Sequence, residues 1–470
     1  MNDAHPAPTS AFSDLPLSPA LLQGVDALDY SSMTPVQAQS LPAILDGRDV
    51  IAQAPTGSGK TAAFGLGLLH RLDAARGETQ ALVLCPTREL ADQVAKQLRK
   101  LAVGVPNLKI SLLSGGLALG PQLASLEHVP HVVVGTPGRV QELVRKQALS
   151  LRSLRTLVLD EADRMLDMGF EEAIRDIVGR TPKTRQTLLF SATFAEEIRA
   201  IAASMLREPV EVSVESAAGA ARVDEVFFEV EPARRTQALA ALLLEYRPES
   251  CVVFCNMRRD ADEVAASLQH YGFSALALHG DMEQRDREEV LVRFANRSCH
   301  VLVASDVAAR GLDVEDLAAV VNFELPSDPD VYVHRIGRTA RAGKGGLALS
   351  LCSPRELARA DQLQARRVAQ GESRPLQWRK VTPVGGKPSN VPAAAMATLR
   401  IDAGRTDKLR PGDIVGALTG EAGLKADSIG KIDVFPTRSY VAIARQQAGR
   451  ALDALRAGRI KNRKFRVSRL

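Results

Sequence analysis

One stretch near the N-terminus decides the fold of the first part of the chain, Asp49-Val50-Ile51-Ala52-Gln53-Ala54-Pro55-Thr56-Gly57-Ser58-Gly59-Lys60-Thr61. Its apolar beginning, residues 50–53, is typical of a buried strand, and the run 62–69 that follows is typical of a helix. A loop between a strand and a helix directs backbone N–H groups and a helix N-terminus at one point. Glycines let such a backbone wrap closely around phosphates. We therefore predict a phosphate-binding loop over residues 54–61.

This interpretation gives roles to particular residues of the loop. Lys60 would reach the β- and γ-phosphates of a nucleotide, and the Thr61 hydroxyl would bind Mg²⁺. Glycine-rich turns before helices are common, and Ala54 stands where such loops usually have glycine. Taken alone, the loop therefore leaves the ordinary-turn interpretation open.

A second apolar run, residues 156–159, ends in Asp160-Glu161-Ala162-Asp163. Two acids at the end of a buried strand suit Mg²⁺ and an attacking water. Asp160 would hold the metal through water, and Glu161 would orient or deprotonate the attacking water. The alternative is that the acids cap a helix. Together with the Lys60 loop, they indicate a nucleotide triphosphatase that uses ATP and Mg²⁺.

Composition limits the class of protein. The chain has 470 residues, which predicts two or three domains, and its 45% hydrophobic and 24% charged residues are typical of a soluble globular protein. It contains no run of eighteen apolar residues that could span a membrane, and the polar segment 1–13 does not resemble a secretion signal. We expect a cytoplasmic protein.

The cysteines agree with a reducing compartment. Their number is odd and no pair has the spacing of metal ligands. Cys251 and Cys255 lie in one apolar run, where we expect them to pack as small hydrophobic side chains.

Charge is distributed unevenly along the chain. From Ala394 to the end there are 16 basic and 7 acidic residues, a net charge of +9, whereas the remainder has a net charge of −4. A local basic excess usually marks contact with a polyanion. A merely solubilising surface is the alternative.

Short apolar runs alternate with helical patterns in two successive sets, which predicts two parallel sheets covered by helices. The first set of expected strands is 50–53, 81–85, 110–113, 132–134, 157–160 and 187–191. The second set is 252–255, 275–278, 301–305, 319–323 and 347–351. The second set has no Gly-Lys-Thr loop, so we expect it to bind no nucleotide of its own.

The basic tail has a different pattern. Strands are expected at 397–401, 430–434, 440–444 and 464–468, and helices at 411–419 and 448–457. The order βαββαβ is that of a ferredoxin-like fold, which RNA-recognition modules share. The fold alone does not establish RNA binding.

These patterns divide the chain. We expect a disordered N-terminus over 1–11, an α/β domain over 12–213, a linker over 214–224, a second α/β domain over 225–378, a linker over 379–393 and the small α+β domain over 394–470.

The second α/β set contains an arginine cluster, His334-Arg335-Ile336-Gly337-Arg338-Thr339-Ala340-Arg341. Its three arginines are three residues apart, and on the start of a helix they would share one face. Arginine binds phosphate with two parallel hydrogen bonds, as an arginine finger does. The cluster could equally pair with surface acids.

In order and over nearly its whole length, the chain resembles the DEAD-box RNA helicases. The resemblance implies two tandem RecA-like domains that bind ATP and single-stranded RNA. Met33-Thr34-Pro35-Val36-Gln37 is similar to the adenine-reading motif of the family. It implies nucleotide contacts by Thr34 and Gln37, with Gln37 on the adenine edge and Phe12 over the adenine face.

Other segments match RNA-gripping and coupling motifs of the same family. The implied RNA contacts are Pro86, Thr87, Arg88, Gly115, Gly116, Thr136, Gly138, Arg139, Gln284, Arg287 and Ser305. The implied ribose and γ-phosphate contacts are Asp313, Arg338 and Arg341, and the residues implied in coupling are Asp163, Ser191, Thr193 and His334. Any one of these segments alone is also an ordinary turn.

The tail is similar to that of the DbpA subfamily, on Met396-Ala397-Thr398-Leu399 and on residues 410–420. This implies binding to a hairpin of large-subunit (23S) ribosomal RNA near the peptidyl-transferase centre, and a role in assembly of the 50S subunit. An ordinary module stacks bases on two or three aromatic rings of its sheet. Here only Tyr440 occupies such a position, and it can pack instead, so we expect recognition of a folded hairpin through charge and shape. The candidate RNA contacts of the tail are Lys431, Arg438, Tyr440, Lys461, Arg463 and Lys464.

The sequence therefore predicts a monomeric ATP-dependent RNA helicase that unwinds short duplexes locally. Two alternatives belong to other classes: an RNA clamp gated by nucleotide, and a helicase that acts on DNA. The intact Lys60, Glu161, Arg338 and Arg341 argue against the clamp, and the RNA-type tail argues against DNA.

Overall fold

The computed structural model describes residues 11–55, 57–192, 196–214, 223–306, 317–339, 345–369, 374–420 and 423–470. Its contacts divide the chain into two compact units. The first is formed by the described residues up to Val214. The second is formed by those from Val223 on, and contains two separate sheets.

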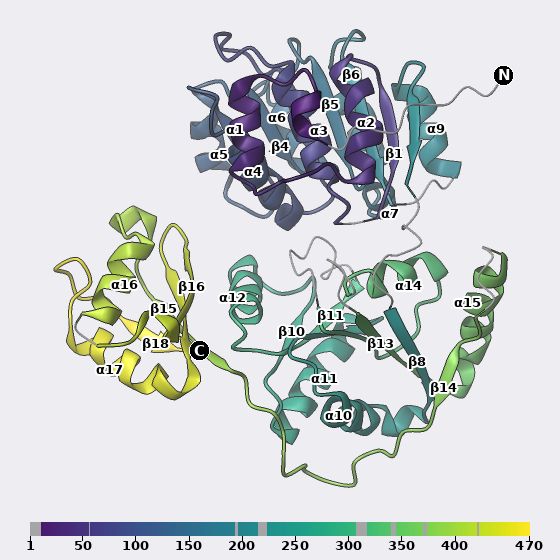
Figure 1. Ribbon diagram of the computed structural model, residues 1–470, viewed down its shortest axis with the longest axis vertical. Helices are drawn as coiled ribbons and strands as arrows, with labels where there is room; N and C mark the ends of the chain where they lie inside the picture. Colours follow the sequence, from purple (N-terminus) through teal and green to yellow (C-terminus); the bar gives the residue numbers. More distant parts are fainter. Residues whose placement is uncertain are drawn as a thin grey trace. The chain divides into compact units, whose positions relative to one another are not determined.

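The first unit alternates strands and helices (Figure 1). Its strands are β1 Val50–Gln53, β2 Ala81–Leu84, β3 Ile110–Leu113, β4 Val132–Gly135, β5 Thr156–Asp160, β6 Gln186–Ser191 and β7 Val210–Ser213. Its helices are η1 Phe12–Asp14, α1 Pro19–Asp26, α2 Pro35–Leu45, α3 Lys60–His70, α4 Arg88–Leu101, α5 Leu119–Leu126, α6 Pro137–Arg145, α7 Ala162–Asp167, α8 Glu171–Gly179 and α9 Glu196–Met205.

The strands of this unit form one parallel sheet in the order β3-β4-β2-β5-β6-β1-β7. All six strands expected from the sequence are present, and the predicted parallel sheet covered by helices is confirmed. The sequence analysis missed β7, because this edge strand is short and half-exposed and lacks a continuous apolar run. The carboxyl ends of parallel strands share one edge of the sheet, where loops collect functional residues.

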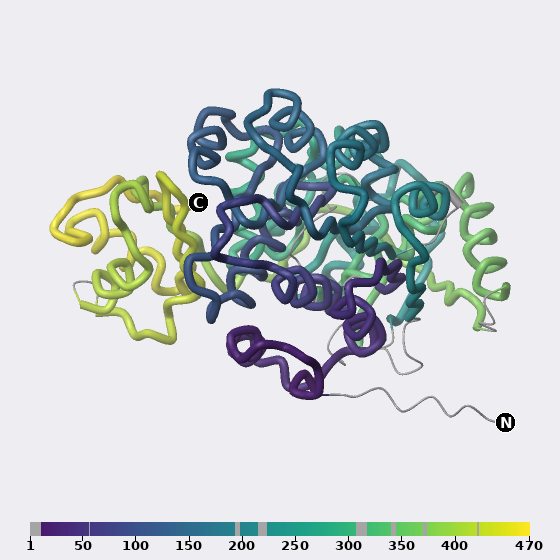
Figure 2. Tube along the Cα trace, turned by 90° about the horizontal axis from the view of Figure 1, so that it is seen from above, coloured from purple at the N-terminus to yellow at the C-terminus, as the bar shows by residue number. Residues whose placement is uncertain are grey.

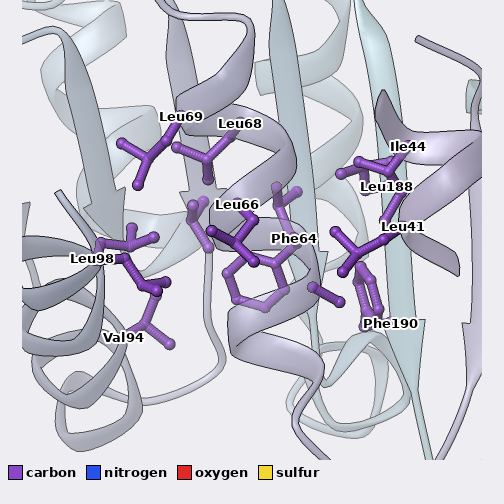
Figure 3. Close-up of a cluster of buried hydrophobic side chains, with 14 of the residues drawn as sticks. Leu41, Ile44, Phe64, Leu66, Leu68, Leu69, Val94, Leu98, Leu188 and Phe190 are labelled. Atoms are coloured by element: carbon purple, nitrogen blue, oxygen red, sulfur yellow. The ribbon is translucent and has the colours of Figure 1, made fainter. Parts of the chain in front are cut away.

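Alternate residues of each strand face opposite sides of this sheet, and each side carries its own apolar cluster. On one side, α2, α3 and α4 pack on the sheet, and Phe64 of α3 lies 5.4 Å from Phe190 of β6 between ring centroids. Figure 3 shows this cluster, with Leu41 and Ile44 of α2 and Leu98 of α4 around α3. The apolar packing fixes the start of α3 over the end of β1.

The second unit begins with another alternating set. Its strands are β8 Val223–Glu229, β9 Cys251–Cys255, β10 Ala275–Leu278, β11 Val301–Ser305, β12 Ala319–Asn322, β13 Gly346–Cys352 and β14 Gln377–Arg379. Its helices are η2 Pro232–Arg234, α10 Arg235–Tyr246, α11 Arg258–Tyr271, α12 Gln284–Ala295, α14 Pro329–Ile336, η3 Pro354–Glu356 and α15 Leu357–Ala369.

These strands form a second parallel sheet in the order β10-β11-β9-β12-β13-β8-β14. All five expected strands are present, whereas β8 and β14 were missed. The β8 sequence starts with charged residues that hide its apolar half, and β14 is an exposed edge strand. The buried Cys251 and Cys255 pack in the apolar cluster under α10 and α11, as predicted.

The C-terminal segment folds onto itself around a small antiparallel sheet, coloured yellow-green to yellow in Figure 2. Its order is β15 Met396–Ile401, η4 Arg405–Asp407, α16 Pro411–Thr419, η5 Ala426–Ser428, β16 Ile429–Val434, β17 Ser439–Ala444, η6 Arg445–Gln447, α17 Ala448–Ala457 and β18 Val467–Arg469. The strand order β16-β17-β15-β18 confirms the predicted ferredoxin-like fold. The last strand starts three residues later than expected.

Across the described residues, no helix is both long enough and apolar enough to cross a membrane.

Candidate functional site

The loop 54–59 and the acids after β5 meet at one edge of the first sheet. Strand β6 lies between β1 and β5, and Phe190 aligns with Ala52 on one side and with Asp160 on the other. The backbone N–H of Ala54 donates to Ser191 O at 3.1 Å. Two segments about one hundred residues apart in sequence are thus brought together, as the sequence analysis predicted.

The loop has the backbone conformation that a phosphate cradle needs. Gly57 and Gly59 have φ values of 80° and 94°, which side chains with a Cβ rarely adopt. Lys60 is buried at the first turn of α3, and its Nζ donates to Ala54 O at 2.9 Å. This bond folds the lysine back over the loop that it would share with a phosphate. Thr56 lies outside the described residues, whereas Thr61 is on the first turn of α3.

Gln37 connects α2 to the same loop. Its Oε1 accepts from Thr34 N at 2.9 Å, and its Nε2 donates to Gly59 O at 3.0 Å. A Cβ at Gly59 would lie 2.4 Å from Gln37 Nε2, so this contact requires glycine. Each amide atom of glutamine can form a second hydrogen bond, which leaves capacity for an adenine edge. Gln37 therefore positions the loop and still has hydrogen-bonding capacity for a base.

Phe12 is 4% exposed and belongs to the first apolar cluster. Its ring stacks on Tyr30 at a centroid distance of 6.4 Å. An adenine contact by Phe12 stays a prediction.

The acids after β5 are strongly affected by burial. Burial raises the pKa of Asp160 to about 7; the nearby Lys60 opposes this shift and Glu161 adds to it. Glu161 has a φ of 53° and its Oε2 lies 3.3 Å from Arg164 Nε. That backbone strain turns the carboxylate at the end of β5. Asp163 caps the Arg164 backbone N–H through Oδ1 at 3.0 Å.

These groups fit a magnesium ion held together with a nucleotide. A buried carboxylate whose pKa is raised toward 7 is an electrostatically unbalanced group, which a divalent cation would balance. Among the described residues, no three metal-ligating side chains form a cluster. Magnesium usually takes one or two protein ligands plus phosphates and water. Asp160 and the Thr61 hydroxyl are the ligands that this arrangement offers.

The expected RNA contacts of the first domain lie at the other half of the same sheet edge, after β2, β3 and β4. Thr87 caps α4 by accepting from Leu90 N at 3.3 Å. The Gly115 N–H donates to Thr136 Oγ1 at 3.2 Å, which joins the loops after β3 and β4. Helices α4 and α6 both begin here, and helix N-termini favour anions.

Two arginines complete this group of loops. Arg88 lies so close to Gly116, which has a φ of 71°, that a Cβ there would be 2.4 Å from its Nη1. Arg139 donates to Leu117 O at 3.0 Å and pairs with Glu142 at 3.1 Å. The structure thus gathers the predicted contacts Pro86, Thr87, Arg88, Gly115, Gly116, Thr136, Gly138 and Arg139 at neighbouring strand ends.

In the second domain, the structure places three of the predicted RNA contacts at strand ends or just beyond them. Arg287 of α12 donates to His279 O at 3.1 Å, just beyond β10, and Gln284 begins the same helix. Ser305 ends β11 and is buried. Thr193, Asp313 and Arg341 lie outside the described residues.

The predicted helical start of the arginine cluster is wrong. Helix α14 begins at Pro329 and ends at Ile336, so Arg335 lies in its last turn and Arg338 follows it in a turn. Arg338 is 5% exposed, and His334 is on the partly exposed side of α14. Arg335 and Arg338 therefore do not share one helical face.

Arg335 was missed as a structural residue. It is 2% exposed and forms two bonds to the Asp306 carboxylate, at 2.6 and 2.7 Å. It also donates to Asn322 Oδ1 at 3.1 Å and to Asn256 Oδ1 at 2.8 Å. Arg335 therefore ties together the ends of β9, β11 and β12. This role had no signal in the sequence, because the three side-chain partners are 13 to 79 residues away along the chain.

In the C-terminal domain, Tyr440 packs rather than presenting its ring. It is 3% exposed and meets Phe435 edge-on at a centroid distance of 5.6 Å. Burial raises its pKa. The other candidates are charged side chains: Lys431 pairs with Asp433 at 3.4 Å, and Arg463 with Asp407 at 3.4 Å.

A basic cavity of about 350 Å³ lies at one end of this domain. Lys461, a predicted contact, lines it together with three residues that the sequence analysis missed, Arg405, Lys408 and Arg410. In the part of the chain that the structure describes, these three have no carboxylate within ion-pair distance. Lys464 and Arg438 lie outside this lining.

Comparisons with known proteins agree with this geometry. The DEAD/DEAH box helicase family matches residues 34–201, the helicase conserved C-terminal domain matches 234–343, and the DbpA RNA binding domain matches 398–469. The chain is 52% identical to the ATP-dependent RNA helicase DbpA of Escherichia coli strain K12 over 463 residues, which cover 97% of this chain and 99% of that protein. It is 41% identical to the DEAD-box ATP-dependent RNA helicase CshA of Geobacillus kaustophilus over 356 residues, 76% of each chain.

Among solved structures, Saccharomyces cerevisiae Dbp5 bound to RNA and ADP BeF3 is similar to this chain. The TM-score is 0.71 at 29% identity, and the match covers 79% of this chain and 95% of that one. This similarity agrees with two tandem RecA-like domains.

Proposed function

Because the chain belongs to the DbpA subfamily of the DEAD-box ATP-dependent RNA helicases, we propose that it unwinds short duplexes in large-subunit ribosomal RNA. The general activity, an ATP-dependent RNA helicase with an RNA-binding C-terminal domain, follows from the family. The target, the residue roles and the biological setting are the proposal.

In the nucleotide site, Lys60 exchanges its bond to Ala54 O for the β- and γ-phosphates, while the N–H groups of the loop surround them. Asp160 and Thr61 would hold magnesium, which would neutralise phosphate charge. Glu161 orients and deprotonates the attacking water. Gln37 transmits the presence of the base to the loop, because it touches Gly59 directly.

Hydrolysis depends on the second domain, which contributes Arg338 and Arg341 to the γ-phosphate. RNA held by the loops after β2, β3 and β4 of the first domain, and by Gln284, Arg287 and Ser305 of the second, favours the closed state. Closure bends one strand and displaces its partner locally, and hydrolysis resets the enzyme. The residues that couple ATP hydrolysis to displacement of the RNA strand are Asp163, Ser191, Thr193 and His334.

The observation that carries the targeting proposal is a contrast within the C-terminal domain. Tyr440 is buried, whereas Arg405, Lys408 and Arg410 of the basic cavity have no carboxylate within ion-pair distance among the described residues. Base stacking needs exposed rings and is worth about 1–3 kcal/mol per base. Arg405, Lys408, Arg410 and Lys461 instead offer cations that suit the backbone of a folded RNA. We propose that they grip the 23S rRNA hairpin near the peptidyl-transferase centre, and that a cytoplasmic monomer acts there during 50S assembly.

Steady-state ATPase with three RNAs at matched salt tests this proposal. The RNAs are a 23S rRNA fragment with the hairpin, the same fragment with the hairpin loop scrambled, and poly(A). We expect strong stimulation by the first only. Equal stimulation by all three would contradict the hairpin target and leave the general helicase activity standing.

A double charge reversal tests whether the basic cavity binds the hairpin. The Arg405→Glu/Arg410→Glu variant should lose the preference for the intact hairpin, while poly(A)-stimulated ATPase stays the same. Lys425→Glu is the matched control, because Lys425 is also exposed in this domain and lies outside the cavity. A similar loss per reversed charge in the control would assign the effect to overall charge.

A further inference from the structure

A second basic cavity lies in the first domain, far from the predicted nucleotide and RNA loops. Its volume is about 700 Å³. It is lined by residues at the end of α3 and by residues that precede β5 and β6. The nucleotide loop follows β1, and parallel strands point the same way, so this cavity is at the opposite edge of the sheet.

The lining is cationic. His70, Arg71, Arg152 and Arg155 contribute basic side chains, and Ser153 and Thr184 contribute hydroxyl groups. The lining contains no carboxylate and no Phe, Tyr or Trp ring. Such a surface attracts anions and has no platform on which a base could stack.

The two inner arginines are held in place by the backbone and not by acids. Arg155 Nη1 donates to Arg71 O at 3.3 Å, and the Arg155 backbone is bonded to both Gln80 and Gln186. Arg71 packs against Gly47, where a Cβ would lie 2.2 Å from its Nη1. Among the described residues, the buried Nε of Arg71 has no hydrogen-bond partner. A guanidinium has five N–H donors, so Arg155, which uses one of them on Arg71 O, has others for a ligand.

Nearby carboxylates are occupied elsewhere. Asp49 accepts from Thr187 N at 2.8 Å and from Arg207 N at 2.7 Å, and Asp73 pairs with Arg76 at 3.1 Å. Asp46 is exposed and follows Leu45 of the lining, but it forms no ion pair with these arginines. The dipole of α3 favours cations at its C-terminus, which accounts for His70 and Arg71. It does not account for Arg152 and Arg155, which come from another segment.

We propose that this cavity binds phosphate groups of the RNA backbone, as a second RNA contact of the first domain. The inference rests on the RNA binding of the family but not on the hairpin target. Arginine forks match phosphate geometry, and the absence of rings means that the contact reads no sequence. An RNA must pass around the edge of the domain to reach the cavity from the loops after β2, β3 and β4. Long folded RNA therefore engages it, whereas a short single strand that fills those loops does not.

Binding of two RNAs to the full chain over a salt series tests the proposal by fluorescence anisotropy. One probe is a long structured rRNA fragment, and the other is a single strand of about 10 nucleotides, within the usual site size of one module. The variants are Arg152→Glu, which changes an exposed residue, and Arg155→Gln, which keeps an amide donor for Arg71 O. Lys100→Glu is the control, because it reverses one exposed charge near the end of α4, outside the cavity.

We expect each cavity variant to weaken binding of the long RNA several-fold and to reduce the salt slope by about 1. Binding of the short strand and the ATPase that it stimulates should stay the same. Unchanged affinity for the long RNA would overturn the proposal. An equal loss with Lys100→Glu, or an equal loss for the short strand, would also overturn it. If these binding results were obtained but the ATPase showed no preference for the intact hairpin, only the proposal of the 23S target would be contradicted.

Discussion

The two α/β domains have sheets with the same strand order, and they differ in the side chains at the strand ends. Counted from the first strand of each domain, both sheets have the order 3-4-2-5-6-1-7. In the first domain, the helix after the first strand begins with Lys60, and in the second the corresponding helix begins with Arg235. Both side chains are buried cations at topologically equivalent positions.

Their partners are different. Arg235 pairs with Glu356 and, at 3.4 Å, with Glu324, and its guanidinium lies 5.6 Å from the centre of the Phe323 ring. Among the described residues, Lys60 Nζ has the carbonyl of Ala54 as its one hydrogen-bond partner, and the nearby acid Asp160 has a raised pKa. A cation whose partners are inside its own domain stabilises the fold. A cation without such partners is available for a ligand, which agrees with the expectation that the first domain holds the nucleotide.

The largest expected effect is loss of the catalytic step, from a substitution in the first domain. Glu161→Gln should lower kcat by about 10²–10⁴-fold, the range for loss of a general base. ATP and RNA should remain bound together, because the amide keeps the shape of the side chain. Single-turnover hydrolysis and equilibrium binding measure the two properties, and normal turnover would exclude Glu161 as the base.

Substituting the two equivalent cations separates ligand binding from stability. Lys60→Met should reduce ATPase by about 10²–10³-fold, as for loss of one charge-stabilising donor, with little change in unfolding. Arg235→Met should instead destabilise the second domain by about 3–5 kcal/mol, because Glu356 and Glu324 lose a buried partner.

Denaturant unfolding and ATPase, measured on both variants, provide the check. Arg235→Lys is the control for the second domain, since it keeps the charge. If Lys60→Met destabilised the protein as much as Arg235→Met, the distinction between the two positions would be wrong.

A smaller effect follows from the pKa of Asp160, which burial raises to about 7. Magnesium needs the ionised carboxylate, so the affinity for magnesium nucleotide should rise roughly tenfold from about pH 6 to about pH 8. Asp160→Asn should weaken binding and remove this dependence. A flat profile in the unsubstituted protein would contradict the raised pKa.

The same group affects stability without nucleotide, with the opposite trend. The folded state holds the proton more tightly than the unfolded chain, so this contribution is greatest below the ordinary pKa of 3.8 and is lost as pH rises through about 7. In unfolding curves measured over this pH range, the Asp160→Asn variant should not show the loss of stability that comes from this carboxyl group.

The smallest effect extends the comparison to the C-terminal domain. Tyr440→Leu should change hairpin affinity less than about twofold, because the buried ring already has its partners in the protein. If the Tyr440 ring stacked on a base, its loss would weaken the free energy of RNA binding by about 1–3 kcal/mol instead. Anisotropy with the intact and scrambled hairpins distinguishes the two, and Tyr440→Phe is the control for the hydroxyl.

Much of the fold was predictable because its signals are local. Buried strands such as β1, β2 and β11 are continuous apolar runs, and the glycines around Lys60 mark a loop that must turn in a particular way. The strands that were missed have weaker local signals: β7 and β14 are partly or fully exposed, and β8 starts with charged residues.

From the sequence alone, Lys60 and the acids after β5 could be predicted as residues of the nucleotide site, since spacing along one strand and one loop marks them. Which arginines are structural depends on tertiary contacts. Arg335 belongs to a cluster that the sequence allowed to bind either phosphate or surface acids, and Arg235 carried no sequence signal, but partners distant in the chain bury and pair both. Tertiary structure also assembles the cavity of Arg71 and Arg155, which four separate segments line. Burial and pairing are non-local properties, and they determine whether a charge stabilises the fold or binds a ligand.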